Sequence, residues 1–80
     1  MKIEAKVKGA VVGKPDDICS VNVDEDYVES DPDVVRAYII DELYIMLANE
    51  PCEINEAGLE VLNMDDIVSE IVQLSSEDPV

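Results

Sequence analysis

The sequence predicts an α+β fold, in which an N-terminal antiparallel β-hairpin or three-stranded sheet packs against two to three helices. Three observations support this prediction. Apolar and polar residues alternate near the N-terminus, helix-start signals follow at about residue 30, and two later segments carry apolar residues at helical spacing. A chain of 80 residues is expected to form a single domain over residues 1–80.

Two strands are expected, at about residues 2–12 and 18–24. In both segments apolar residues occupy alternate positions, which is the pattern of a half-buried strand. The turn-forming sequence Gly-Lys-Pro-Asp-Asp at residues 13–17 separates them and predicts an antiparallel hairpin with a longer loop. Residues 26–29 either add a short third strand or form a connection.

Helices are expected at about residues 32–49, 56–62 and 64–74. The Ser-Asp pair at residues 30–31 offers a side-chain cap for the first helix, and a proline fits its first position. Gly58 lies within the second of these segments and lowers its helix propensity. The third has an apolar stripe opposite an acidic face, and Asn63 is expected to cap it.

The first helix is unusual because its apolar residues project at every angle around the axis. Such a helix must be covered on all sides. Either the rest of this small chain wraps it completely, or a second copy covers part of it. We expect a homodimer, with Ile40, Tyr44 and Leu47 at the interface.

The charge is distributed very unevenly along the chain. Four of the five basic residues are lysines within the first fourteen positions, which sum to +3. The remaining residues contain one cation, Arg36, and nineteen carboxylates, and they sum to −18. Because so much like charge destabilises a folded domain, we expect the charge to serve a function.

The sequence carries no catalytic or cofactor motif, and no enzymatic activity, cofactor or metal is expected. It contains no histidine, no nucleophile motif and no glycine-rich phosphate loop. Asn22, Asp24 and Asp26 have the alternate spacing of calcium ligands. However, Tyr27 stands where an EF-hand loop requires glycine, and no helix precedes the segment.

Cys19 and Cys52 have no metal-type spacing and are interpreted as small core residues, with a disulfide between them as the alternative. No segment has the continuous apolar run of a signal peptide or a membrane span. A cytoplasmic location is therefore expected. The acidic part would repel both anionic membranes and nucleic acid, so neither is expected as a partner.

The acidic residues lie along predicted regular elements, where successive carboxylates would be about 6–7 Å apart. Such rows can resemble successive phosphates. A dimer would carry −30, equivalent to about 15 base pairs at one charge per ~1.7 Å. The partner-binding carboxylates are expected at the exit of the second strand and along the later elements: Asp24, Glu25, Asp26, Glu29, Glu56, Glu60, Asp65, Asp66 and Glu70.

In size, acidity and scarcity of cations, residues 15–80 resemble the small acidic proteins of phages and mobile elements that imitate DNA. The resemblance is one of composition and includes no signature motif. It implies inhibition of a basic DNA-binding protein in the host cytoplasm. Possible targets of this class are HU-type nucleoid-associated proteins, restriction enzymes, uracil-DNA glycosylases and CRISPR effectors. The alternative hypothesis is an accessory module that its partner recognises through apolar surface.

Overall fold

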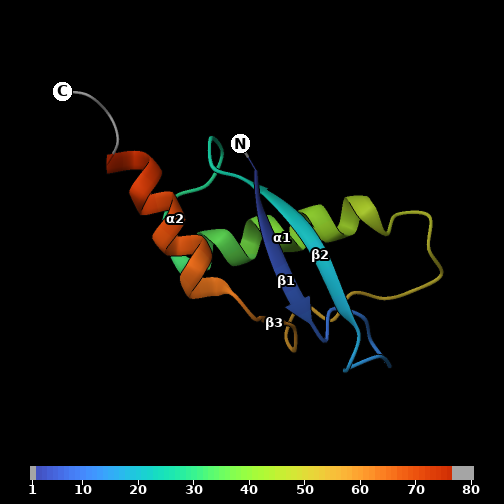
Figure 1. The fold of residues 1–80 in the computed structure, drawn as a ribbon. Helices are drawn as coiled ribbons and strands as arrows, with labels where there is room; N and C mark the ends of the chain where they lie inside the picture. Colours follow the sequence, from blue (N-terminus) through green and yellow to red (C-terminus); the bar gives the residue numbers. More distant parts are fainter. Residues whose placement is uncertain (1, 77–80) are drawn as a thin grey trace.

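The computed structural model describes residues 2–76 and confirms an α+β fold (Figure 1). The elements follow in the order β1 (Lys2–Lys8), β2 (Ile18–Asp24), α1 (Pro32–Met46), β3 (Glu60–Val61) and α2 (Met64–Ser76). The strands form one antiparallel sheet in the order β2-β1-β3. The N-terminal hairpin is therefore confirmed, and the sheet has three strands.

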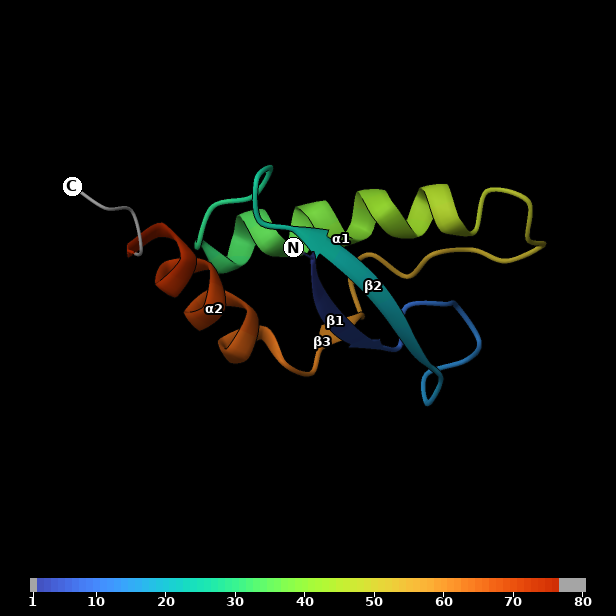
Figure 2. The same cartoon turned by 45° about the horizontal axis from the view of Figure 1, so that its top comes forward.

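Both helices lie on the same side of the sheet, so the molecule has two layers (Figure 2). Alternate residues of β1 and β2 point into the space between these layers, as the sequence pattern predicts. They meet one buried stripe of α1 and the apolar side of α2. The core at 5 % exposure or less consists of Ile3, Ala5, Val7, Ala10, Val21, Val23, Val35, Ile39, Leu43, Leu59, Ile67 and Ile71.

The first strand is shorter than the expected 2–12 and ends at Lys8. Gly9 follows with φ of +71°, a left-handed conformation that turns the chain out of the sheet. Beyond it, Val11 forms isolated bridges with Lys14 and with Ile54. The last part of the expected strand is therefore a separate connection that contacts a distant segment of the chain.

The third strand lies at Glu60–Val61, and the segment 26–29 forms no strand. Immediately after β2, the Tyr27 N–H donates to the Asp24 carbonyl oxygen at 3.0 Å, which turns the chain away from the sheet. The predicted helix at 56–62 is likewise wrong, because residues 56–58 form a turn that leads directly into β3. Both differences arise because β1 offers its second edge to a segment far away in sequence.

The turn before β3 depends on one amide side chain. Asn55 Oδ1 accepts the Gly58 N–H at 3.1 Å, and Asn55 Nδ2 donates to the Gly9 carbonyl oxygen at 3.3 Å. A Cβ atom at Gly58 would collide with the Asn55 amide. A glycine that weakens helix formation is thus the residue that this turn requires.

The start of α1 confirms the sequence prediction. Asp31 is the N-cap, with its Oδ1 accepting the Asp33 N–H at 2.9 Å, and Pro32 opens the helix. The helix ends at Met46 rather than at residue 49, because Leu47 leaves the helical region with φ of −104° and ψ of 16°. The last of the three expected helices, at 64–74, is α2 in the structure, and it extends through Ser76.

The molecule is elongated, with principal extents of 48 × 21 × 16 Å. Much of this length comes from α1 and the connection after it, which extend beyond the sheet (Figures 1 and 2). None of the described helices is long and apolar enough to cross a membrane.

Candidate acidic interface

The nine carboxylates expected to bind a partner lie in three regions of the molecule. Asp24 is the last residue of β2, Glu25, Asp26 and Glu29 follow it, and Glu56 lies in the long connection after α1. The other four belong to β3 and α2. Asp24 and Glu25 are half-buried, and the remaining seven are exposed: Asp26, Glu29, Glu56, Glu60, Asp65, Asp66 and Glu70.

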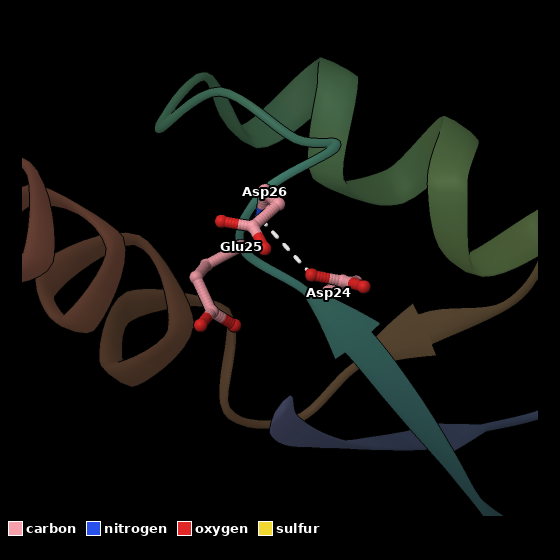
Figure 3. A group of neighbouring side chains, drawn as sticks. All are labelled: Asp24, Glu25 and Asp26. Atoms are coloured by element: carbon pink, nitrogen blue, oxygen red, sulfur yellow. Dashed lines mark hydrogen bonds between the residues drawn. The ribbon is translucent and has the colours of Figure 1, made fainter. Parts of the chain in front are cut away.

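Only one of these groups forms a tight cluster. One carboxylate oxygen from each of Asp24, Glu25 and Asp26 lies within 4.8 Å of the others (Figure 3). Asp24 Oδ1 accepts the Asp26 N–H at 3.0 Å, whereas the Glu25 side chain extends on the side of α2. A hydrogen bond from its own backbone lowers the pKa of Glu25 below its usual value, which favours the charged form.

This cluster does not reproduce the calcium loop that the spacing suggested. Ca²⁺ takes about six to eight oxygen ligands. In the structure Asn22 lies within β2, whereas Asp33, the residue at the twelfth position counted from Asn22, lies in the first turn of α1. The ligand positions of such a loop are therefore divided between two regular elements. The cluster supplies three carboxylates at the end of a strand, and its chemistry is that of a concentrated negative charge.

Asp65 and Asp66 occupy the first turn of α2 and border an open hollow of about 390 Å³ lined by residues 61–66. The positive end of the helix dipole favours carboxylates at these positions. Glu60 lies opposite Lys8 in the β1–β3 ladder, where the two charges attract each other. Its negative charge is therefore less available to a partner than those of α2.

Glu56 belongs to a second acidic region, which the sequence did not single out. It lines a pocket of about 400 Å³ together with Glu50 and Glu53, between the end of α1 and the returning chain. Tyr44 closes one side and donates a hydrogen bond from its hydroxyl to Glu56 Oε2. The signal that was missed is the series of three glutamates at every third residue of a segment that the sequence predicts to be mostly loop.

The one cation after residue 14, Arg36, lies on α1 and does not neutralise this surface. Its guanidinium donates to the Leu59 carbonyl oxygen at 2.9 Å and to the Glu56 carbonyl oxygen. Both acceptors are backbone groups, so Arg36 holds the connection against the helix and leaves the acidic side chains to solvent or to a partner.

The three residues expected at a dimer interface occupy a flank of α1 that the chain itself partly covers. Ile40 and Leu47 are half-buried and pack against the core. Tyr44 is exposed but bonds to Glu56. The most exposed large apolar residue of α1 is instead Ile45, at 69 %.

The two cysteines have different environments. Cys19 is half-buried in β2 and packs against the core, as expected, whereas Cys52 is exposed in the connection after α1. The interpretation of Cys52 as a core residue is therefore wrong. Both thiols are free, so no disulfide joins them in this structure.

No family model matches the chain, and neither the curated proteins nor the solved structures include a match to it. Two features of the molecule itself bear on its function: exposed carboxylates distributed along an elongated frame, and an apolar region where α1 extends beyond the sheet.

Proposed function

We propose that this protein is a DNA mimic that binds and inhibits a basic DNA-binding protein. The observation that carries the proposal is the linear charge density. A net charge of −15 over a length of 48 Å amounts to about one negative charge per 3.2 Å, close to the ~3.4 Å between charges along one DNA strand. A groove that accepts a phosphate backbone would meet a similar density of charge.

The placement of the charges supports the same proposal. Exposed carboxylates lie on β3 and α2 and in the turn after β2, which are held by a common core. Arg36 is occupied by backbone carbonyls, and the β1 residues Lys6 and Lys8 belong to the sheet face that the helices leave uncovered. Within residues 2–76, the sheet register sets Lys2 opposite Asp24 and Lys8 opposite Glu60, so the negative charge that remains available to a partner lies mainly on the other seven carboxylates.

In this mechanism each carboxylate takes the place of a phosphate and none reacts. Long-range attraction steers the acidic protein toward its partner and speeds association. Binding also releases counterions from both surfaces, so affinity should fall steeply as salt is added. The expected setting is the cytoplasm, where the protein would bind neither nucleic acid nor membrane.

The test is displacement of a fluorescent duplex of about 15 base pairs from basic DNA-binding proteins, beginning with an HU-type protein, a restriction enzyme and a CRISPR effector. The expected result is competition at about 0.05 M salt that weakens by orders of magnitude at about 0.2 M. Binding that persists at about 1 M NaCl, or that leaves the duplex in place, would contradict mimicry.

Charge variants provide the control. Reversal of five exposed carboxylates, in D26K/E29K/D65K/D66K/E70K, should abolish displacement. The single substitution D65N should change it little, because isolated surface charges contribute only about 0–1 kcal/mol. If the five-fold variant displaced DNA as well as the wild type, the acidic surface would not be the binding surface.

One observation favours a second candidate function, an interaction module recognised through apolar surface. Ile45 and Met46 are 69 % and 50 % exposed at the end of α1, next to the exposed Tyr44. Recognition through these residues would survive high salt. A homodimer also remains a prediction, and sedimentation equilibrium of the full chain would test it.

A further inference from the structure

The β2 strand forms an open edge of the sheet, and the hydrogen bonds of β1 identify the backbone groups that this edge presents. The Lys6 N–H donates to Asn63 Oδ1, and the Lys6 carbonyl accepts from the Leu62 N–H, so the even-numbered residues of β1 direct their backbone N–H and C=O groups toward β3. The odd-numbered residues of β1 therefore direct their backbone groups toward β2, in the register Ala5↔Val21. It follows that the even-numbered residues of β2 direct their N–H and C=O groups outward.

Ser20 and Asn22 are the central residues of this edge, and both side chains are exposed. Asp24, at the end, already uses its carbonyl to accept the Tyr27 N–H. Within residues 2–76, no backbone hydrogen bond outside the ladder reaches Ser20 or Asn22. Their two N–H and two C=O groups are available to another extended chain.

The edge also lacks the usual protection against such pairing. Edge strands are commonly short, or carry charged residues or proline. The opposite edge follows this rule, because β3 has two residues, one of them Glu60. In β2, by contrast, residues 18–23 contain no charge and no proline, in a chain whose residues are 31 % charged.

Helix α1 extends over the space beside this edge. Its fifteen residues measure about 22 Å, whereas three strands span only about 10 Å. Figures 1 and 2 both show α1 continuing beyond β2. At 100° per residue, Met46 points within about 20° of the mean direction of the buried residues Val35, Ile39 and Leu43, yet it is 50 % exposed. The sheet-facing stripe thus continues past the last strand.

Negative charge surrounds the neutral centre of the edge. Exposed Asp16 and Asp17 precede β2 and outnumber the neighbouring cation Lys14, and the Asp24–Asp26 cluster lies at the end of the strand. On the α1 side, Glu42 lies near Tyr38, where burial raises the pKa of the tyrosine and the Glu42 and Asp24 carboxylates raise it further. The lysines of β1 are one strand further in: Lys6 and Lys8 lie opposite Ser20 and Ile18, and Lys2 lies opposite Asp24. Glu25 and Asp26 add two further carboxylates beyond that pair.

These charges discriminate between possible occupants. A second copy paired antiparallel through β2 would bring the Asp24–Asp26 cluster of one chain to the Asp16–Asp17 end of the other, and the carboxylates would repel. A basic segment would instead be attracted at both ends. Its alternate apolar side chains would lie beneath Met46 and cover it.

We propose that the open edge of β2 binds an extended segment of a basic protein partner as a fourth strand, with alternating apolar and Lys or Arg side chains. Backbone hydrogen bonds to Ser20 and Asn22 provide the pairing, and the acidic ends of β2 select for positive charge. The inference rests on the proposed function for the basic character of the partner, and it adds how that partner is held.

The experiment titrates the isotope-labelled full chain with a peptide of about nine residues in which valine and lysine alternate. The amide signals of Ser20 and Asn22 should shift and become protected from hydrogen exchange. A Val-Ser peptide of the same length lacks the charge and should bind more weakly. An all-lysine peptide that gives the same protection would overturn the proposal, because charge alone would then explain binding.

The variant S20P/N22P removes both outward N–H groups and leaves the ladder to β1 intact. It should weaken binding of the Val-Lys peptide by about tenfold. The matched control S20T/N22T keeps both N–H groups and should bind like the wild type. Circular dichroism checks that each variant folds. If S20P/N22P does not fold, the single variant S20P or N22P is used in its place.

Two further outcomes would overturn the inference, and they differ in what they say about DNA mimicry. If S20P/N22P bound the peptide normally while DNA displacement still depended on the five carboxylates, the edge proposal would fail and mimicry would stand. If sedimentation equilibrium showed a dimer that S20P/N22P abolished, the edge would belong to a second copy. If the wild-type protein displaced no DNA duplex from any of the basic proteins but still bound the Val-Lys peptide through the β2 edge, only DNA mimicry would be contradicted.

Discussion

The side chain of Asn63 continues the pairing of β1 where β3 ends. Its Oδ1 accepts the Lys6 N–H at 2.9 Å, and its Nδ2 donates to the Glu4 carbonyl oxygen at 2.9 Å. The sequence suggested that this residue caps the following helix. In the structure its backbone carbonyl oxygen accepts the Ile67 N–H at 3.0 Å, while its side-chain amide forms hydrogen bonds with β1. One residue thus joins the edge of β1 to the start of α2.

Replacement of Asn63 by alanine should lower the free energy of unfolding by about 1–2 kcal/mol, because two backbone groups lose their partners. Urea denaturation followed by circular dichroism measures the change. The control N63D keeps an acceptor for the Lys6 N–H but loses the donor to Glu4, so its loss should be smaller than that of N63A. An N63A variant as stable as the wild type would show that solvent replaces both bonds without cost.

The contact between Tyr44 and Glu56 predicts a pH dependence. The hydrogen bond to Glu56 raises the pKa of Tyr44 above its ordinary value near 10.0. The bond therefore stabilises the fold fully below pH 10, and this contribution is lost as the pH rises through the raised pKa of the folded protein. In an alkaline titration followed by tyrosinate absorbance, E56Q should shift one component to lower pH. The control Y44F removes that component, and an E56Q curve identical to that of the wild type would contradict the assignment.

Among the elements, α1 has a different environment on each side. Val35, Ile39 and Leu43 are fully buried against the sheet, and Arg36 binds the connection that leads to β3. Its opposite flank, which includes Ile45, is left open. The expectation that a helix apolar on all sides must be covered on all sides is therefore met only in part, because the sheet covers one side of the helix and has too few strands to reach its last turn.

Arg36 predicts how strongly the connection after α1 depends on the helix. R36M should lower the free energy of unfolding by about 2–3 kcal/mol, since hydrogen bonds from a charged donor contribute more than neutral ones. Denaturation with urea measures it. The control K14M makes the same change in net charge at an exposed position and should cost little. If both variants lost equal stability, charge rather than the two carbonyl contacts would explain the effect.

The whole molecule carries its −15 net charge on an elongated frame, and this charge must oppose folding. We expect the melting temperature to rise with salt, by roughly 4–8 °C if about 1 kcal/mol of repulsion is screened. Differential scanning calorimetry from low salt to about 0.5 M NaCl measures the rise.

A neutralised variant gives the control for this salt effect. E29Q/D41N/E50Q/E53Q removes four exposed charges outside the first turns of the helices. It should melt at a higher temperature than the wild type in low salt and respond less to added salt. A melting temperature that does not depend on salt would mean that the charges are too far apart to destabilise the fold.

The sequence by itself determined the local features of this protein. Alternation placed the inward residues of β1 and β2, the Ser-Asp-Pro start located the first helix, and the residue counts established the acidic charge. The first two depend only on residues close together in sequence, through the pleat of a strand and the geometry of a helix cap. The net charge is simply the sum over the residues. The exposed carboxylates of α2 follow from the same helical periodicity.

Only the tertiary structure decided the position of the third strand, the exposure of Cys52 and the open edge of β2. A two-residue strand has too little periodicity to be detected, and it forms because β1 has a free edge beside it. The exposure of Met46 similarly depends on how many strands lie beneath α1. These features are set by contacts between segments distant in sequence, and a local pattern carries no information about such contacts.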